Sequence, residues 1–266
     1  MGVAADPAPG AHLGVVDWGI GGLGLVRALD ELLPSLPITY WSDTGAAPYG
    51  LVPTAALAAR LRAVVGELAS RGCTEVVLAC NAASTVAPRL TGLAVPVTGI
   101  IGAGIAAVPT GADRVGVVGG RRTIASGAYR RGLSRPGRTV ASRVAQPLSA
   151  HIEAGRTGSA GFAADLRHIV APLRAADAVV LACTHYPAAT AQFAAALPGV
   201  ELVDPAGRLA LDLCDRLGGR TSEAAGGPSP APRTHLTTGD PAAMRRAAHL
   251  AWSVDVDPGP VRLAGR

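Results

Sequence analysis

The sequence predicts an α/β protein with two pseudo-symmetric domains, each a doubly wound parallel sheet, and with the active site in the cleft between the domains. Two observations carry this prediction. Short apolar runs alternate along the chain with longer stretches of helical periodicity, and the string VVLAC occurs at residues 76–80 and again at 179–183. Hydrophobic residues make up 49% of the 266 and charged residues only 16%, so a large buried core is readily built.

The predicted strands are short and rich in Val and Ile, as is typical of parallel strands buried between two layers of helices. Between them, Ala55–Ser70 carries leucine and valine at helical spacing with arginine off that stripe. A short helix ending near Trp252 and a last strand near Val254–Val261 follow towards the C-terminus. In order, the other strands are expected at Leu13–Val16, Ile38–Trp41, Val76–Ala79, Val97–Ile101, Val115–Val118, Val179–Ala182 and Glu201–Val203.

The repeat extends beyond the pentapeptide. Gly14–Asp17 (GVVD) precedes its first copy and Gly116–Gly119 (GVVG) precedes its second, both offset by about a hundred residues. We therefore expect two related halves, each with an early strand and a later strand that ends in cysteine. Ligands of open parallel sheets bind at the carboxyl ends of the strands. Pseudo-symmetry would then place Cys80 and Cys183 on opposite sides of the interdomain cleft.

The domain boundaries follow from this repeat. Residues 13–98 together with 207–264 are expected to form the first domain, and 99–206 the second. Residues 1–12 are expected to be a flexible N-terminus, and 221–232 (TSEAAGGPSPAP) a linker. The segment after the linker is too small to fold alone, so we expect it to pack on the first domain.

The chain contains no lysine. A pyridoxal-phosphate enzyme needs a lysine for its Schiff base, and a Walker-A ATPase needs one at the phosphates of its nucleotide. Both classes are therefore excluded. The arginines give a net charge of +5 but are scattered singly or in pairs, without interleaved aromatic residues, so no nucleic-acid partner is expected.

The cysteines Cys73, Cys80, Cys183 and Cys214 form no CxxC pair and no zinc-ligand spacing with histidine, so we expect no metal site. The N-terminal segment lacks the pattern of a signal peptide, and no stretch of about 18 apolar residues could cross a membrane. We expect a cytoplasmic protein without a membrane partner, in which thiols stay reduced and available for chemistry.

Both copies of the repeat place a cysteine where a strand is expected to meet a helix. Cys80 begins CNAAS, and Cys183 begins CTHYP, which adds His185 two residues on. Unpaired backbone N–H groups and the helix dipole favour the thiolate at such a position. Taken alone, a cysteine at the end of an apolar strand is most often a small core residue.

The glycine-rich segment Gly19–Gly24 matches GxGxxG. In a dinucleotide-binding fold an acidic residue follows the second strand, whereas Asp43 lies here inside a polar loop. We therefore expect no nucleotide, and no other cofactor.

Four motifs stand in order along the chain, with weaker ones between and after them. The strong motifs are DxGxGGL at Asp17–Leu23, DTxxxPYG at Asp43–Gly50, ACNxAS at Ala79–Ser84 and CTHYP at Cys183–Pro187; the weaker ones are SGAY at Ser126–Tyr129, IEAG at Ile152–Gly155, VDPA at Val203–Ala206 and TTGDP at Thr237–Pro241. Together they resemble the glutamate racemase family, within the aspartate/glutamate racemase superfamily. The resemblance covers about residues 13–262.

The resemblance implies a cofactor-independent racemase that interconverts L- and D-glutamate, a small anionic amino acid. One of the thiols of Cys80 and Cys183 would remove the α-proton while the other returns a proton to the opposite face. Asp17 would work with Cys80, and His185 with Cys183. The family's setting is peptidoglycan synthesis in cell wall biogenesis, and the resemblance allows a homodimer. The residues expected to contact the substrate are Trp18, Pro48, Tyr49, Gly50, Asn81, Ala82 and Thr184.

The chain departs from the family at two of these positions. Trp18 stands where the family has serine, and Ala82 where it has threonine. Each change removes a hydroxyl, and a buried hydrogen bond to a charged group contributes about 1.5–3 kcal/mol. Three alternatives stay open: racemisation or epimerisation of another small amino acid, isomerisation or decarboxylation of a small diacid by the same thiols, and an impaired family member that acts as a binding protein.

Overall fold

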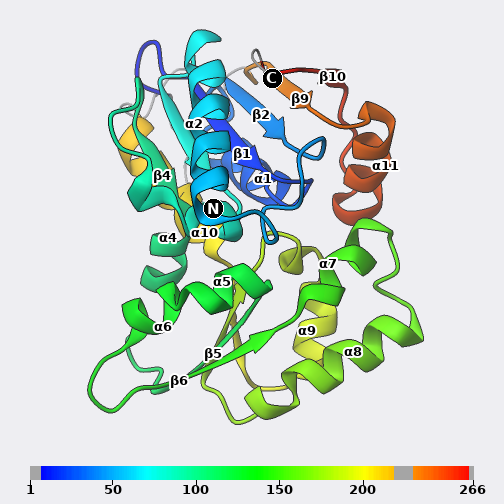
Figure 1. The fold of residues 1–266 in the computed structure, drawn as a ribbon. Helices are drawn as coiled ribbons and strands as arrows, with labels where there is room; N and C mark the ends of the chain where they lie inside the picture. Colours follow the sequence, from blue (N-terminus) through cyan, green and yellow to red (C-terminus); the bar gives the residue numbers. More distant parts are fainter. Residues whose placement is uncertain (1–6, 219–229, 264–266) are drawn as a thin grey trace, which may run out of the picture.

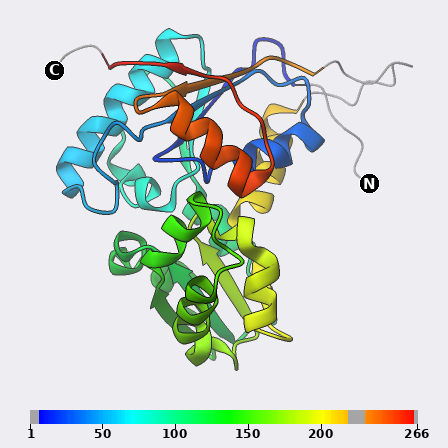
Figure 2. The same ribbon diagram turned by 90° about the vertical axis from the view of Figure 1, so that its right-hand side faces the viewer.

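The computed structural model describes residues 7–218 and 230–263. Residues 1–6 of the predicted N-terminal segment and 221–229 of the predicted linker lie outside these ranges. The described chain forms two lobes, each built on one parallel sheet with helices on both faces (Figures 1 and 2). The predicted fold class is confirmed.

The first sheet has the strand order β10-β9-β2-β1-β3-β4, with every neighbouring pair parallel. Its two faces pack against different helices because alternate residues of a strand point to opposite sides. Val15 lies in the core cluster that α1, α10 and α11 cover, and Val16 in the one that α2 covers. The elements are β1 (Leu13–Asp17), α1 (Leu23–Leu32), β2 (Ile38–Ser42), α2 (Thr54–Ser70), β3 (Glu75–Leu78), α3 (Asn81–Ser84), β4 (Val97–Gly99), α4 (Ile100–Ala106), α10 (Pro205–Leu217), β9 (Arg233–Thr237), α11 (Pro241–Trp252) and β10 (Pro258–Pro260).

The second sheet has the order β6-β5-β7-β8, again all parallel. Val118 and Leu181 pack with α7, α8 and α9 on one face, and Val117 and Val180 with α4 and α6 on the other. The elements are β5 (Arg114–Gly119), α5 (Arg121–Ser126), α6 (Ala128–Leu133), β6 (Thr139–Val144), α7 (Gln146–Glu153), α8 (Ala160–Val170), β7 (Ala178–Ala182), α9 (Thr190–Ala196) and β8 (Glu201–Val203), with short 3-10 turns at Ala87–Arg89, Ala171–Leu173 and Tyr186–Ala189.

The two sheets repeat one topology. The order β2-β1-β3-β4 of the first corresponds strand for strand to β6-β5-β7-β8 of the second. The two VVLAC copies run along β3 and β7 and end in Cys80 and Cys183. The pseudo-symmetry expected from the repeat is therefore present in the fold. We propose that the domains divide at 98–99, near the end of β4, and at 206–207, near the start of α10.

Two predicted strands need correction, and two strands, β6 and β9, were not predicted. The run Val97–Ile101 is a strand only to Gly99, because Ile100 already begins α4. The last strand is Pro258–Pro260, shorter than Val254–Val261, and lies at an edge, where prolines are tolerated because no N–H is needed there. The strand β6 (Thr139–Val144) was not predicted, because it is a largely exposed edge strand without an apolar run.

The segment after the linker packs on the first lobe, as expected. β9 pairs with β2, and β10 with β9. Figure 2 shows α11 and these strands, in orange and red, against the first lobe. Gly24 of α1 makes this docking close, because a Cβ there would lie 2.6 Å from the indole of Trp252. None of the helices in residues 7–218 and 230–263 is long and apolar enough to cross a membrane.

Candidate active site

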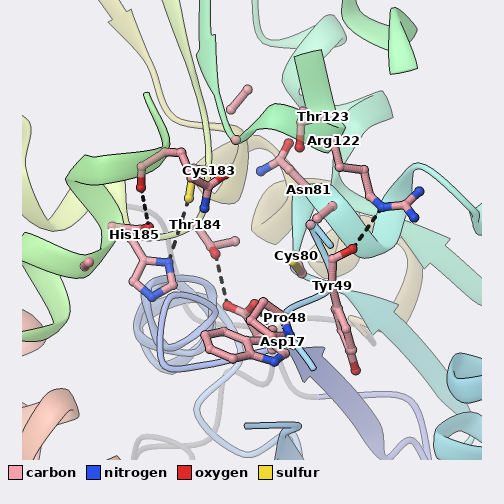
Figure 3. A pocket seen from close by; sticks show the side chains of 18 of the residues that line it. Asp17, Pro48, Tyr49, Cys80, Asn81, Arg122, Thr123, Cys183, Thr184 and His185 are labelled. Atoms are coloured by element: carbon pink, nitrogen blue, oxygen red, sulfur yellow. Dashed lines mark hydrogen bonds between the residues drawn. The ribbon is translucent and has the colours of Figure 1, made fainter. Parts of the chain in front are cut away.

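A cavity of about 370 Å³ lies where the strand ends of the two lobes meet. The loops after β1 and β3 line it from the first lobe, and the segments after β5 and β7 line it from the second. All eleven residues predicted for the site line this one cavity: Asp17, Trp18, Pro48, Tyr49, Gly50, Cys80, Asn81, Ala82, Cys183, Thr184 and His185. Figure 3 shows most of them.

Cys80 is the N-cap residue of α3 and is 9% exposed. Burial first, and then the negative charge of Asp17, raise the pKa of Cys80 well above its ordinary value. The backbone N–H groups of Ala83 and Ala82 act in the opposite direction without reversing the shift. The helix terminus thus favours the thiolate, as expected, but burial and Asp17 outweigh it, and the thiol form of Cys80 is favoured.

Cys183 follows β7, but its surroundings differ from those of Cys80. The chain first passes through Thr184 and His185, and His185 is the N-cap residue of the 3-10 turn Tyr186–Ala189. The expectation of a helix beginning directly at Cys183 is therefore wrong. Instead, Nδ1 of His185 lies 3.8 Å from Sγ of Cys183 (Figure 3). The two thiols thus stand at corresponding strand ends with different immediate partners.

Glu153, at the end of α7, contacts the other nitrogen of His185. The distance from Oε1 to Nε2 is 2.7 Å. Burial on its own would lower the pKa of His185, but Cys183 and Glu153, through hydrogen bonds and negative charge, raise it well above its ordinary value. His185 is therefore an imidazolium held between a carboxylate and a sulfur. Glu153 belongs to the weak IEAG motif, and this motif is the only feature of the sequence that points to a role for Glu153 in the site.

Asp17 ends β1 and is held by donors from both lobes. Its Oδ1 accepts from the backbone N–H of Trp18 at 2.7 Å, and its Oδ2 accepts from the backbone N–H of Gly22 and from Oγ1 of Thr184, the latter at 3.0 Å. The carboxylate also acts on Cys80 through its charge, as the raised pKa of that thiol shows. A role for Asp17 beside Cys80 remains a prediction.

The glycine-rich segment after β1 lets the second lobe approach closely. A Cβ at Gly21 would lie 2.3 Å from Oγ1 of Thr184, and one at Gly19 would lie 2.8 Å from Oε1 of Glu153. Contacts under 3.0 Å are not tolerated without movement. These glycines are therefore explained by close packing against Thr184 and Glu153 at the cavity.

Trp18 and Ala82, the two positions expected to depart from the family pattern, both belong to the cavity wall. The indole Nε1 of Trp18 donates to the backbone carbonyl of Ala46 at 3.0 Å. The ring also packs with Ala82 on the apolar cluster that contains Tyr49 and Cys80. The indole is thus fixed in the wall by a hydrogen bond and by packing.

The segment Pro48–Gly50 of the cavity wall is held by hydrogen bonds to residues of both lobes. The hydroxyl of Tyr49 points away from the cavity and donates to the buried carboxylate of Asp43 at 2.8 Å, which also binds Arg60. From the opposite lobe, Nε of Arg122 donates to the carbonyl of Tyr49 at 2.9 Å (Figure 3). Arg122 also donates to the carbonyl of Val52.

Arg122 was missed by the sequence reasoning. In the sequence it is one of two adjacent arginines, Arg121 and Arg122, and nothing local indicates that it reaches across the cleft from α5. It is the one arginine among the described residues that line the cavity. It therefore supplies a positive charge at the wall as well as a link between the lobes.

The same architecture occurs in a glutamate racemase from Thermus thermophilus, solved in complex with beta-chloro-D-alanine. The two structures superpose with a TM-score of 0.84 at 31% identity, covering 96% of this chain and 98% of that one. Fold and relationship together define a class, that of two-lobed α/β isomerases that racemise amino acids. The family model described as Asp/Glu/Hydantoin racemase matches residues 13–211. The chain belongs to this family.

Similar sequences from other organisms support the same family. A glutamate racemase of Thermus thermophilus is 37% identical over 248 residues, covering 90% of this chain and 92% of the relative. One of Corynebacterium diphtheriae is 35% identical over 246 residues, with the same coverage. The family predicted from the motifs is confirmed. The chain is an enzyme, an isomerase of the amino-acid racemase type.

Proposed function

We propose that this enzyme interconverts L- and D-glutamate without a cofactor, using Cys80 and Cys183 as an opposed acid and base. The observation that carries the proposal is that both cysteines line one cavity from equivalent strand ends of two related lobes. The names of the relatives at 35% and 37% identity support glutamate as the substrate.

In the proposed reaction, one thiolate removes the proton from the α-carbon. The electron pair of the broken C–H bond stays on the substrate, delocalised towards its carboxylate. The thiol on the other side then donates its proton to the opposite face of the α-carbon. The product is the other enantiomer, and the two cysteines have exchanged protonation states.

The electrostatics favour one starting arrangement. Cys80 is a thiol because burial and Asp17 raise its pKa. Cys183 has the imidazolium of His185 at 3.8 Å as a charge partner for a thiolate. We propose that Cys183 is the base and Cys80 the acid when the first substrate binds. Glu153 holds the imidazolium in place through its 2.7 Å contact.

The cavity wall supplies groups suited to an anionic amino acid. Backbone N–H groups beside the two cysteines, with Asn81 and Thr184, would hold the substrate carboxylate and the negative charge that develops on it. Pro48, Tyr49 and Gly50 would close one side. The positive charge of Arg122 favours an anion over a neutral substrate.

Solvent exchange tests the function. The enzyme is incubated in D₂O with L- or D-glutamate, and α-deuterium and the enantiomer ratio are followed by NMR and chiral chromatography. Deuterium in both enantiomers, abolished by Cys80→Ser and by Cys183→Ser, is the expected result. Cys214→Ser is the matched control, because Cys214 lies on α10 outside the cavity lining.

Trp18 gives a specific reason to include other substrates in that experiment. Its fixed indole fills wall space and offers no hydroxyl to a glutamate carboxylate. Deuterium entering only another small amino acid or a diacid would replace glutamate as the substrate while keeping the two-thiol chemistry. No exchange into any compound of the set would overturn the catalytic proposal and leave a binding protein.

The proposed product also defines a biological test. The family's role in peptidoglycan synthesis requires a supply of D-glutamate, and this supply is needed in the cytoplasm. We propose that expression of this chain supports growth of a bacterium that needs external D-glutamate. Growth that is lost with Cys183→Ser is expected; no growth despite racemase activity in the extract would contradict the cell-wall role.

A further inference from the structure

The amide of Asn81 has one satisfied end and one unsatisfied end. Asn81 directly follows Cys80, begins α3 and is 2% exposed. Its Oδ1 accepts a hydrogen bond from the hydroxyl of Tyr129 at 2.8 Å. Its Nδ2 is buried without a hydrogen-bond partner among the described residues. A buried donor left unpaired is unfavourable. We therefore expect a bound ligand to accept a hydrogen bond from this nitrogen.

The surroundings point to the substrate as that ligand. Asn81 lines the cavity that Cys80 and Cys183 share. In Figure 3 its amide nitrogen points towards the side of the pocket where Cys183 lies. An N–H donor at this place matches a carboxylate, which only accepts hydrogen bonds. The opposite orientation of the amide would present a carbonyl and would repel a carboxylate.

Tyr129 determines which orientation the amide takes. It comes from α6 in the second lobe and is 2% exposed. Burial, with the negative charge of Asp204 adding to it, raises the pKa of Tyr129 well above its ordinary value, so the hydroxyl keeps its proton. The ring also has no freedom to withdraw towards α4, because it packs so closely on Gly104 that a Cβ there would lie 2.5 Å from the hydroxyl.

We propose that Tyr129 is a positioning residue that orients the amide of Asn81 so that its N–H donors face the carboxylate of the bound substrate beside Cys80. The inference rests on the proposed function for the identity of that substrate. The hydroxyl of Tyr129 touches neither thiol and takes no part in proton transfer. Its contribution is to substrate binding, through the amide that it holds.

The chain offers an unusually direct observation, because Asn81 is its only asparagine. Protein labelled with ¹⁵N on asparagine side chains should give one pair of amide resonances, without any assignment step. Tyr129→Phe removes only the hydroxyl and should shift this pair in the ligand-free enzyme. Tyr186→Phe is the control: it removes another buried hydroxyl, which donates at 2.8 Å to the carbonyl of Ala145 and interacts with Cys183 rather than with Asn81. An unmoved Asn81 pair in Tyr129→Phe would overturn the proposal.

Binding gives the second readout. Glutarate, which carries carboxylates but no ammonium group, should shift the Asn81 pair on titration into the wild type. Tyr129→Phe should weaken glutarate binding and raise the KM for glutamate roughly ten-fold, with kcat changed less than two-fold. A fall in kcat at unchanged KM would contradict a positioning role in binding.

A double-mutant cycle separates positioning from general structural damage. With Asn81→Ala already in place, Tyr129→Phe should cause no further loss of glutarate affinity, because its only route to the ligand is gone. An equal loss in both backgrounds would overturn the proposal. The ligand-free NMR shift does not depend on turnover, so a wild type that fails to racemise glutamate would count against the proposed function while the Asn81 resonances still decide the role of Tyr129.

Discussion

Thr184 donates a hydrogen bond to Asp17 across the cleft, with 3.0 Å between Oγ1 and Oδ2 and both residues buried. Asp17 ends β1 of the first sheet, and Thr184 follows β7 of the second. This bond therefore joins the lobes beside the two cysteines. It exists only because Gly21 leaves room for the threonine side chain.

Gly21→Ala should separate these groups. The new Cβ would lie 2.3 Å from Oγ1 of Thr184, so the loop after β7 must move. Overpacking of this kind costs about 1–3 kcal/mol of unfolding free energy, and urea unfolding should detect it together with a loss of racemase activity. Gly66→Ala is the control: Gly66 is an exposed glycine of α2 with open space around it, where alanine should stabilise by about 0.5–1 kcal/mol. Equal stability of the two variants would refute this account.

Glu153→Gln should change how stability depends on pH. The folded-state pKa of His185 is raised, so its contribution to stability is fully present below the unfolded value of about 6.5 and is lost as the pH rises through the folded value. Removing the charge of Glu153 lowers that folded value. The variant should lose on the order of 1 kcal/mol at pH 6 and show a flatter decline towards pH 8.

Urea unfolding measured between pH 5.5 and 8 checks this prediction. Most thiols with an ordinary pKa stay protonated over this pH range. Asp165→Asn serves as the control, because it removes a half-exposed carboxylate 3.4 Å from another histidine, His151, and neither residue belongs to the cavity lining. Such an exposed pair contributes little. Parallel curves for wild type and Glu153→Gln would show that the carboxylate does not set the pKa of His185.

Introducing the two hydroxyls that the family resemblance implies should improve glutamate binding. Ala82→Thr adds a hydroxyl to the cavity wall, and Trp18→Ser adds one while removing the indole and its bond to Ala46. A hydrogen bond to a charged group contributes about 1.5–3 kcal/mol, so each change should lower the KM for glutamate roughly ten-fold or more. Ala55→Thr, on the exposed side of α2, should leave the KM unchanged. A higher KM in both cavity variants would indicate a pocket built for another substrate.

Arg122→Gln should loosen the cavity wall. The guanidinium holds the carbonyls of Tyr49 and Val52 from the opposite lobe, and it is the arginine of the described cavity lining. Its loss should raise the KM for glutamate about ten-fold, from weaker closure and one less positive charge. Arg121→Gln makes the same change in charge one residue earlier, outside the cavity lining, and should have little effect. Similar KM values for the two variants would contradict the link.

The positions of the cysteines could be predicted because they depend on local pattern. Apolar runs define the strands, and a parallel sheet places the residue after each strand at a common edge. No further information was needed to predict that Cys80 and Cys183 lie at this edge. Glu153, Arg122 and Tyr129 could not be found in this way, because they come from helices of the second lobe and reach the cavity only through the way the two sheets face each other.

The extent to which Cys80 is buried could not be predicted from the sequence either. The helix terminus at Cys80 is visible as a motif, but the desolvation that outweighs it depends on packing by residues far along the chain. The exposed edge strand β6 was missed for the opposite reason, since little of it enters the core. Pattern reasoning is strongest where one run of residues is buried by its own neighbours.

The matching strand orders of the two lobes have a consequence for kinetics. The backbone is nearly symmetric about the cavity, yet Cys183 has an imidazolium beside it and Cys80 has none. Enantiomers have equal free energies in an achiral solvent, so for the proposed reaction kcat/KM must be the same in both directions. The chemical inequality of the thiols can therefore appear only in the separate kcat and KM values, which should differ between L- and D-glutamate by a common factor.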